Sequence, residues 1–159
     1  MKILSIEHIG IAVKDIENSS PFWEHILGIK HTTTEIVEHE GVKTDIYDTG
    51  SGKVELLKSI SGDSTIEKFL NKKGEGIHHV CFQVDNIYQA INELKENNIK
   101  IIKKSSYYET PSYPNNKHPK FINIVIKINT TLKPKELVKL EQEILKLILK
   151  QKLWIQIRL

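Results

Sequence analysis

Two histidines and one carboxylate, His8, His79 and Glu55, are the residues of this chain best suited to metal chemistry. Each histidine lies in a run rich in β-branched residues, 6–13 and 77–84, whose alternating character is typical of a strand. Imidazole and carboxylate ligands together suit zinc, cobalt, nickel, manganese or iron. The three residues therefore predict a divalent-metal site, provided that the fold brings them together.

An internal repeat is the reason to expect this convergence. Superposing His8 on His79 also superposes Val13 on Val84, so a strand followed by a helix recurs at an offset of 71 residues. Two such halves, each a small curved sheet with one covering helix, can pair to enclose a cleft. Equivalent strand positions then face each other across it.

Strand alternation assigns the remaining geometry. His8 and His79 are predicted to lie on the face opposite the helix-packing side chains, and Glu55 lies opposite Val54 and Leu56 on its own strand. An isolated strand histidine is more often a surface or core residue than a ligand. That interpretation applies to the other histidines, with His78 expected to pack or give support: His25, His31, His39, His78 and His118.

Capping residues and apolar spacing predict the elements that position these side chains. Asp15 and Asn86 are candidate N-caps, and Ser64 opens a capping box. The predicted helices span 15–27, 64–73 and 86–97, and the predicted strands of the first half also include 29–37, 42–47 and 53–57.

Composition narrows the class of protein. The 159 residues include 39% apolar and 27% charged residues, which is ordinary for a soluble globular protein. The single Cys81 excludes an internal disulfide and suggests a reducing compartment. No apolar run approaches the roughly 20 residues of a membrane span, and no signal-peptide pattern begins the chain. We expect a cytoplasmic protein.

Charge is distributed unevenly along the chain. Residues 1–100 carry a net charge of −5 and residues 101–159 a net charge of +8. A basic C-terminal part can indicate affinity for nucleic acid or membrane surfaces. A solvated helix face with an irregular loop is the favoured alternative, so neither kind of partner is expected.

Particular segments resemble a known family. Residues 6–13, Phe22-Trp23 and Leu27-Gly28 resemble the opening of vicinal-oxygen-chelate proteins, the glyoxalase and bleomycin-resistance superfamily. Within it, residues 54–57, 63–70 and 74–79 look like methylmalonyl-CoA epimerases. The linker 63–70 discriminates best, because glyoxalases do not normally carry it. The resemblance covers about residues 4–103.

The resemblance implies an α+β fold of paired βαβββ modules. A single domain, 1–159, would then contain module one (4–58), a linker helix (64–73), module two (75–128) and a divergent C-terminal helix (134–150). It also implies a small-molecule acyl-CoA substrate, a homodimer, and a divalent ion such as cobalt, manganese, zinc or nickel. His8, Glu55 and His79 match ligand positions of the family.

The fourth ligand position of the family falls on Glu143, which would also be a catalytic base. The surrounding motif is not intact, because lysine replaces its histidine and its glycines are gone. The segment carries Leu137, Leu140, Ile144 and Leu147 at helical spacing, with Pro134 fitting a first turn. We therefore predict a helix over 134–150 and a strand within 121–128, which leaves the second module incomplete or altered.

The implied activity is epimerisation of methylmalonyl-CoA, in which an α-proton is removed and returned through a metal-stabilised enediolate. Glu143 is the candidate base; another base position of the family falls on Thr44, which cannot act as one, and the adjacent Asp45 faces the other way. Two alternatives remain: a glyoxalase-like lyase, which the linker disfavours, and an inactive or metal-free binding relative, which the altered C-terminus supports.

Overall fold

The computed structural model describes residues 1–97, 99–110, 121–129 and 154–158. The chain divides into two compact units. The contiguous unit comprises residues 7–80, and the discontinuous unit comprises residues 1–6 and 81–159. Strands β1 (Ile3–Ala12) and β5 (Gly76–Val84) each contribute residues to both units.

The contiguous unit is a sheet with a helix packed on each face. Between β1 and β5 its elements are α1 (Ile16–Pro21), the π-helix η1 (Phe22–Ile26), β2 (Lys30–Val37), the 3₁₀-helix η2 (Glu38–Glu40), β3 (Val42–Asp48), β4 (Lys53–Ser59) and α2 (Thr65–Lys73). The strand order is β2-β3-β4-β1. Strand β4 is antiparallel to β3 and parallel to β1. This is the βαβββ module that the family resemblance implied.

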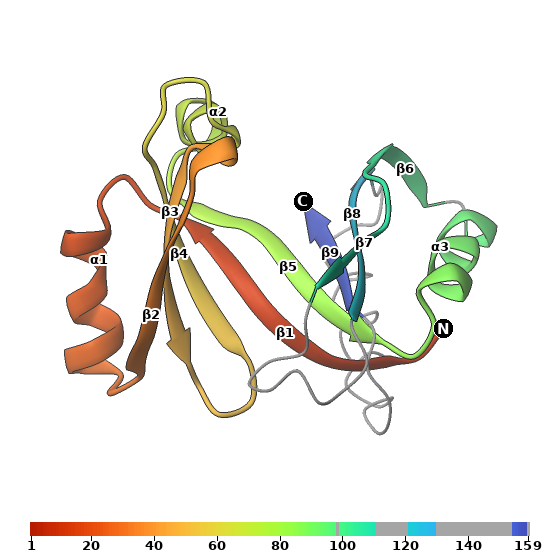
Figure 1. Ribbon diagram of the computed structural model, residues 1–159, viewed down its shortest axis with the longest axis horizontal. Helices are drawn as coiled ribbons and strands as arrows, with labels where there is room; N and C mark the ends of the chain where they lie inside the picture. The colour runs from red at the N-terminus through yellow and green to blue at the C-terminus, as the bar shows by residue number, and fades with distance from the viewer. Residues whose placement is uncertain (98, 111–120, 130–153, 159) are drawn as a thin grey trace. The chain divides into compact units, whose positions relative to one another are not determined.

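Helix α1 begins where the sequence predicts. The Asp15 carboxylate accepts a hydrogen bond from the backbone N–H of Asn18 at 2.8 Å, which satisfies a donor of the first turn. The helix covers one face of the sheet (Figure 1), and the fully buried Ile16 packs there against Tyr47 and Leu56. The helical segment of α1 and η1 ends before Gly28, whose φ of 67° favours glycine.

Helix α2 is the predicted linker helix. The Ser64 hydroxyl accepts a hydrogen bond from the backbone N–H of Glu67 at 2.9 Å, and Gly74 is the C-cap. Ile66 of this helix is buried with Ala12 and Leu57 of the sheet. The helix is therefore held to the face of the sheet opposite α1.

The discontinuous unit contains the ends of β1 and β5, then α3 (Ile87–Glu96), β6 (Lys100–Lys104), β7 (Tyr108–Thr110), β8 (Phe121–Asn129) and β9 (Trp154–Arg158). Strands β6 and β7 are antiparallel to β8. In the core, Val84, Ile87 and Ile91 pack with Ile124 and Ile126 of β8. The predicted helix 86–97 and the predicted strand within 121–128 are both confirmed.

The last strand of the discontinuous unit departs from the pattern of the first module. Strand β9 pairs parallel with β8, with Ile124 opposite Ile155, whereas β4 pairs antiparallel with β3. The second module is thus altered, as the sequence predicted. The predicted helix 134–150 lies outside the described residues, and the predicted module boundaries stay predictions. None of the helices in the described ranges has the length and hydrophobicity that a membrane span requires.

Candidate metal centre

Strand pairing in the contiguous unit places β4, which carries Glu55, beside β1, which carries His8. In the parallel β1–β4 pair, His8 is the register partner of Lys53, and Gly10 is the register partner of Glu55. Partners in a ladder share a face of the sheet, so His8 and Glu55 lie on the same face, two positions apart. The sequence predicted this from alternation within each strand.

The predicted site residues do come together. The Nε2 atoms of His8 and His79 lie 2.9 Å apart. Glu55 Oε1 lies 3.5 Å from His8 Nδ1, and Glu55 Oε2 lies 4.0 Å from His79 Nε2. One candidate ligand atom of each residue lies within 4.8 Å of those of the other two.

The spacing of these atoms fits a divalent ion. Two nitrogens that bind one metal at about 2.0–2.1 Å with a right angle between the bonds are about 2.9 Å apart. The two Nε2 atoms have this separation, and a carboxylate lies beside them. His8, Glu55 and His79 therefore could hold a metal ion with little rearrangement of the strands.

Gly10 makes room for the second histidine. A Cβ atom added at Gly10 would overlap the His79 ring, whose atoms Cε1, Nδ1 and Nε2 are the nearest. Glycine is needed here because the ring lies directly over the β1 backbone. The sequence of this strand alone does not reveal this role, since the His79 ring comes from another strand.

Burial and charge act against each other at the cluster. Burial lowers the pKa of His8, but the hydrogen bond with Glu7 and the charges of Glu55 and Glu7 outweigh it, so the pKa is raised. Burial raises the pKa of Glu55, and the favourable charge of His8 opposes this only in part. Both groups therefore bind a proton more readily than they would in water, and a cation would bind in competition with protons.

His78 supports His79 from the side. It is buried, its Nδ1 lies 3.0 Å from His79 Nδ1, and its ring packs edge-on against Phe69 of α2. The Nδ1 of His79 is therefore occupied, and its Nε2 is directed toward His8. These contacts suit the supporting role that the sequence suggested for His78.

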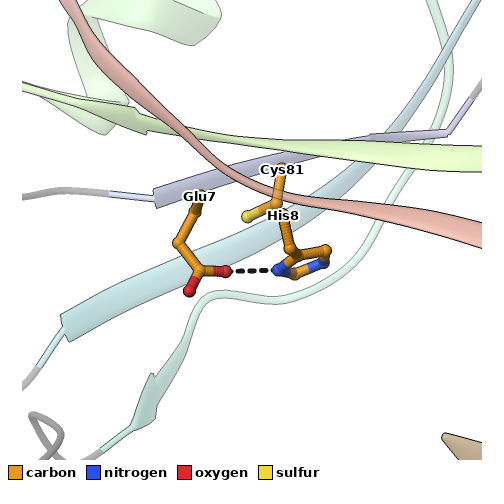
Figure 2. A group of neighbouring side chains, drawn as sticks. All are labelled: Glu7, His8 and Cys81. Atoms are coloured by element: carbon orange, nitrogen blue, oxygen red, sulfur yellow. Dashed lines mark hydrogen bonds and ion pairs between the residues drawn. The ribbon is translucent and has the colours of Figure 1, made fainter. Parts of the chain in front are cut away.

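Glu7 is a site residue that sequence analysis missed. Its carboxylate Oε2 hydrogen-bonds Nδ1 of His8, as Figure 2 shows, and its Oε1 accepts a hydrogen bond from Lys53 Nζ at 2.8 Å. Alternation places Glu7 and His8 on opposite faces, so no simple rule predicts this contact. The third residue drawn in Figure 2, Cys81, belongs to the discontinuous unit.

The candidate acid–base residues lie in different parts of the chain. Glu143 lies outside the described residues. Asp45 pairs with Leu56 and so lies on the face opposite Glu55, as expected, where Thr34 Oγ1 donates to it at 2.7 Å. Glu35 of β2 is the register partner of Thr44, and by this pairing it shares the face of Glu55. The sequence alone does not identify Glu35, because the offset between β2 and β3 cannot be inferred from it.

Two family models match parts of the chain. Residues 7–113, more than half of it, match the Glyoxalase/Bleomycin resistance protein/Dioxygenase superfamily. Residues 80–158 match 7,8-dihydro-6-hydroxymethylpterin-pyrophosphokinase. The second match covers the altered C-terminal part and overlaps the first.

Individual relatives agree with the first match. Human mitochondrial methylmalonyl-CoA epimerase is 38% identical over 96 residues, which are 60% of this chain and 54% of that protein. The ethylmalonyl-CoA/methylmalonyl-CoA epimerase of Cereibacter sphaeroides is 31% identical over 98 residues, 61% of this chain and 73% of that protein. The alignments with the mammalian enzymes span little more than half of their length.

A solved structure extends the likeness to the fold. A Streptomyces coelicolor methylmalonyl-CoA epimerase variant in complex with 2-nitronate-propionyl-CoA aligns with a TM-score of 0.55 at 20% identity. The alignment covers 98% of each chain. With the βαβββ module, the paired histidines and the family match over residues 7–113, the chain belongs to the Glyoxalase/Bleomycin resistance protein/Dioxygenase superfamily.

Proposed function

We propose that the chain is a metal-dependent epimerase of methylmalonyl-CoA. The observation that carries the proposal is the pair of Nε2 atoms of His8 and His79, 2.9 Å apart, with the Glu55 carboxylate beside them. The named epimerases among the relatives supply the substrate class, an acyl-CoA with an α-carboxylate.

In this proposal His8, Glu55 and His79 hold the ion. The ion, when bound, supplies Lewis-acid stabilisation of the negative charge that develops on the thioester oxygen as the α-proton leaves. The chain itself must position the ligands, exclude water and move the proton. The side chains of the two histidines, 13% and 5% exposed, limit the access of water to the ligand nitrogens.

Epimerisation needs a proton acceptor on one face of the α-carbon and a donor on the other. We propose Glu143 as one of these groups and as a fourth ligand. This proposal is supported only by the position of Glu143 in the sequence, which matches the fourth ligand position of the family. Thr44 cannot fill the second role, but its cross-strand partner Glu35 carries a carboxylate on the same face of the sheet. Its charge also contributes to the raised pKa of Glu55, which places it within electrostatic reach of the cluster. Glu35 is the candidate for the second group.

The experiment measures interconversion of (2R)- and (2S)-methylmalonyl-CoA by protein stripped with a chelator and reloaded with Co²⁺. We expect turnover only after reloading, and its loss in His8→Ala and His79→Ala. The matched control is His25→Ala, because His25 is an exposed histidine on η1 of the same unit. A reloaded wild-type protein that binds Co²⁺ but does not interconvert the two isomers would refute the proposal. Turnover of a hemithioacetal instead would identify a glyoxalase-like lyase.

A second candidate activity concerns the C-terminal part. Residues 80–158 match the pterin pyrophosphokinase family, and the last two strands, β8 and β9, are parallel, whereas β3 and β4 of the first module are antiparallel. Both observations favour a separate origin for this part. The candidate activity is that of a pterin pyrophosphokinase. We propose to test this activity directly by incubating the chain with ATP, magnesium and 6-hydroxymethyl-dihydropterin. Formation of AMP would support it, and its absence would leave the epimerase as the proposed activity.

We also propose a homodimer in the cytoplasm. The single cysteine, Cys81, is buried, which supports the cytoplasmic location. The exposed apolar side chains of Phe22, Ile26 and Leu27 support the dimer. Light scattering coupled to size-exclusion chromatography distinguishes an 18.3 kDa monomer from a dimer of twice that mass. A monomer at all concentrations tested would reject the dimer without affecting the proposed reaction.

A further inference from the structure

We infer that Glu7, held in place by Lys53, is a positioning residue that determines which ring nitrogen of His8 is presented to the metal. The inference rests on the metal site of the proposed function and extends it to residues outside the ligand set. Glu7 precedes His8 directly in β1, and Lys53 is the register partner of His8 on β4. All three residues belong to the contiguous unit.

The contacts form a chain of three side chains. Lys53 Nζ donates to Glu7 Oε1 at 2.8 Å, and Glu7 Oε2 hydrogen-bonds His8 Nδ1. The Glu7 and His8 side chains are only 14% and 13% exposed, so the hydrogen bond between them is shielded from competing water, whereas the Lys53 side chain is 36% exposed. A carboxylate can only accept here, so the Nδ1 of His8 carries the proton.

This protonation state has a direct consequence for metal binding. A neutral imidazole has one N–H, and a proton on Nδ1 leaves the lone pair on Nε2. Nε2 is the atom that lies 2.9 Å from His79 Nε2. Glu7 therefore selects the tautomer in which His8 can share an ion with His79.

Glu7 also protects the third ligand. Glu55 Oε1 lies 3.5 Å from the same Nδ1 of His8, close enough to compete for its proton after a small movement. If Glu7 were absent, a hydrogen bond from His8 to Glu55 would engage the carboxylate needed by the metal. With Glu7 present, His8 Nε2 and the Glu55 carboxylate both stay available.

The test replaces Glu7 by glutamine, which keeps the size of the side chain and removes its charge. We expect Glu7→Gln to weaken Co²⁺ binding by about 10- to 100-fold, the usual effect of losing a partner of a ligating histidine. The affinity is measured by competition with a chromophoric chelator. The matched control is Glu17→Gln, which removes ion pairs with Lys43 and Lys58 on the same sheet and should leave the affinity unchanged.

A second measurement needs no variant. Long-range ¹H–¹⁵N spectra of the Zn²⁺-loaded wild-type protein report the tautomer of each histidine, and we expect His8 protonated at Nδ1. Zn²⁺-loaded protein with His8 protonated at Nε2, or a folded Glu7→Gln protein with wild-type Co²⁺ affinity, would overturn the inference. A wild-type protein that binds no Co²⁺ would instead remove the proposed metal site itself, so the two failures are distinguishable.

Discussion

Replacing Gly10 by alanine tests the packing of the candidate metal centre. The added Cβ would overlap the His79 ring, so either the ring or the β1 backbone must move. Overpacking of a buried position costs about 1–3 kcal/mol. For a chain of this size each kilocalorie lowers Tm by roughly 2–4 °C, which gives an expected decrease of about 2–12 °C.

We expect Gly10→Ala to weaken metal binding more than it lowers folding stability. Displacement of His79 changes the 2.9 Å distance between its Nε2 and the Nε2 of His8. We therefore expect Co²⁺ affinity to fall by at least about tenfold, the usual effect of removing a residue that positions a metal ligand. The assays are calorimetric Tm without metal and chelator competition with Co²⁺.

Gly62→Ala is the matched control for Gly10→Ala. An added Cβ at Gly62 meets nothing within 4 Å, and this glycine has no positive φ. The same chemical change should therefore leave Tm and Co²⁺ affinity close to those of the wild type. If Gly10→Ala also keeps wild-type Tm and affinity, the His79 ring does not depend on the space above Gly10, and the packing argument is refuted.

Four further predictions concern the site and its supports. His78→Ala should lower stability through the lost contact with Phe69, and lower Co²⁺ affinity less than His79→Ala does; an equal loss in both variants would make His78 a ligand. Glu143→Gln should reduce turnover strongly in a folded protein, and unchanged turnover in the epimerase assay would exclude Glu143 as the base. Ser64→Ala should cost about 0.5–2 kcal/mol in urea unfolding, because the N-cap hydrogen bond to Glu67 is lost; no change in midpoint would show that the cap is unimportant. Hydrogen bonds from Lys58, its own backbone and Lys43 lower the pKa of Glu17 to about 2, so its stabilising contribution is present above its ordinary pKa of 4.5 and is lost as pH falls through about 2. Glu17→Gln should flatten this part of the acid-unfolding profile, and since the group is exposed, salt should reduce the difference; identical profiles would contradict the assignment.

Sequence patterns predicted those features that depend on local periodicity. The repeat paired His8 with His79, alternation placed Glu55 on their face, and the caps Asp15 and Ser64 located two helices. Each of these signals lies within one element or in the comparison of two equivalent elements.

What sequence patterns missed depends on contacts between strands. Glu7 reaches His8 although simple alternation separates them, and Glu35 gains its position from the offset between β2 and β3. Gly10 matters because the His79 ring from another strand lies over it. The direction of β9 was also beyond prediction, since helical spacing in the preceding segment says nothing about the strand that follows.

The discontinuous unit imposes an order on folding. Its first six residues are synthesised before residues 7–80. Their partners, however, lie far along the chain: the backbone N–H of Lys2 donates a hydrogen bond to Asp85 Oδ1 at 2.8 Å. Residues 7–80 are contiguous in sequence, so all of them are synthesised before the rest of the discontinuous unit, and we expect them to fold first. The first six residues must wait for a partner more than 80 positions away, and such contacts form slowly because loop closure precedes them. In stopped-flow refolding, probes in residues 7–80 should therefore recover earlier than probes around Lys2 and Asp85.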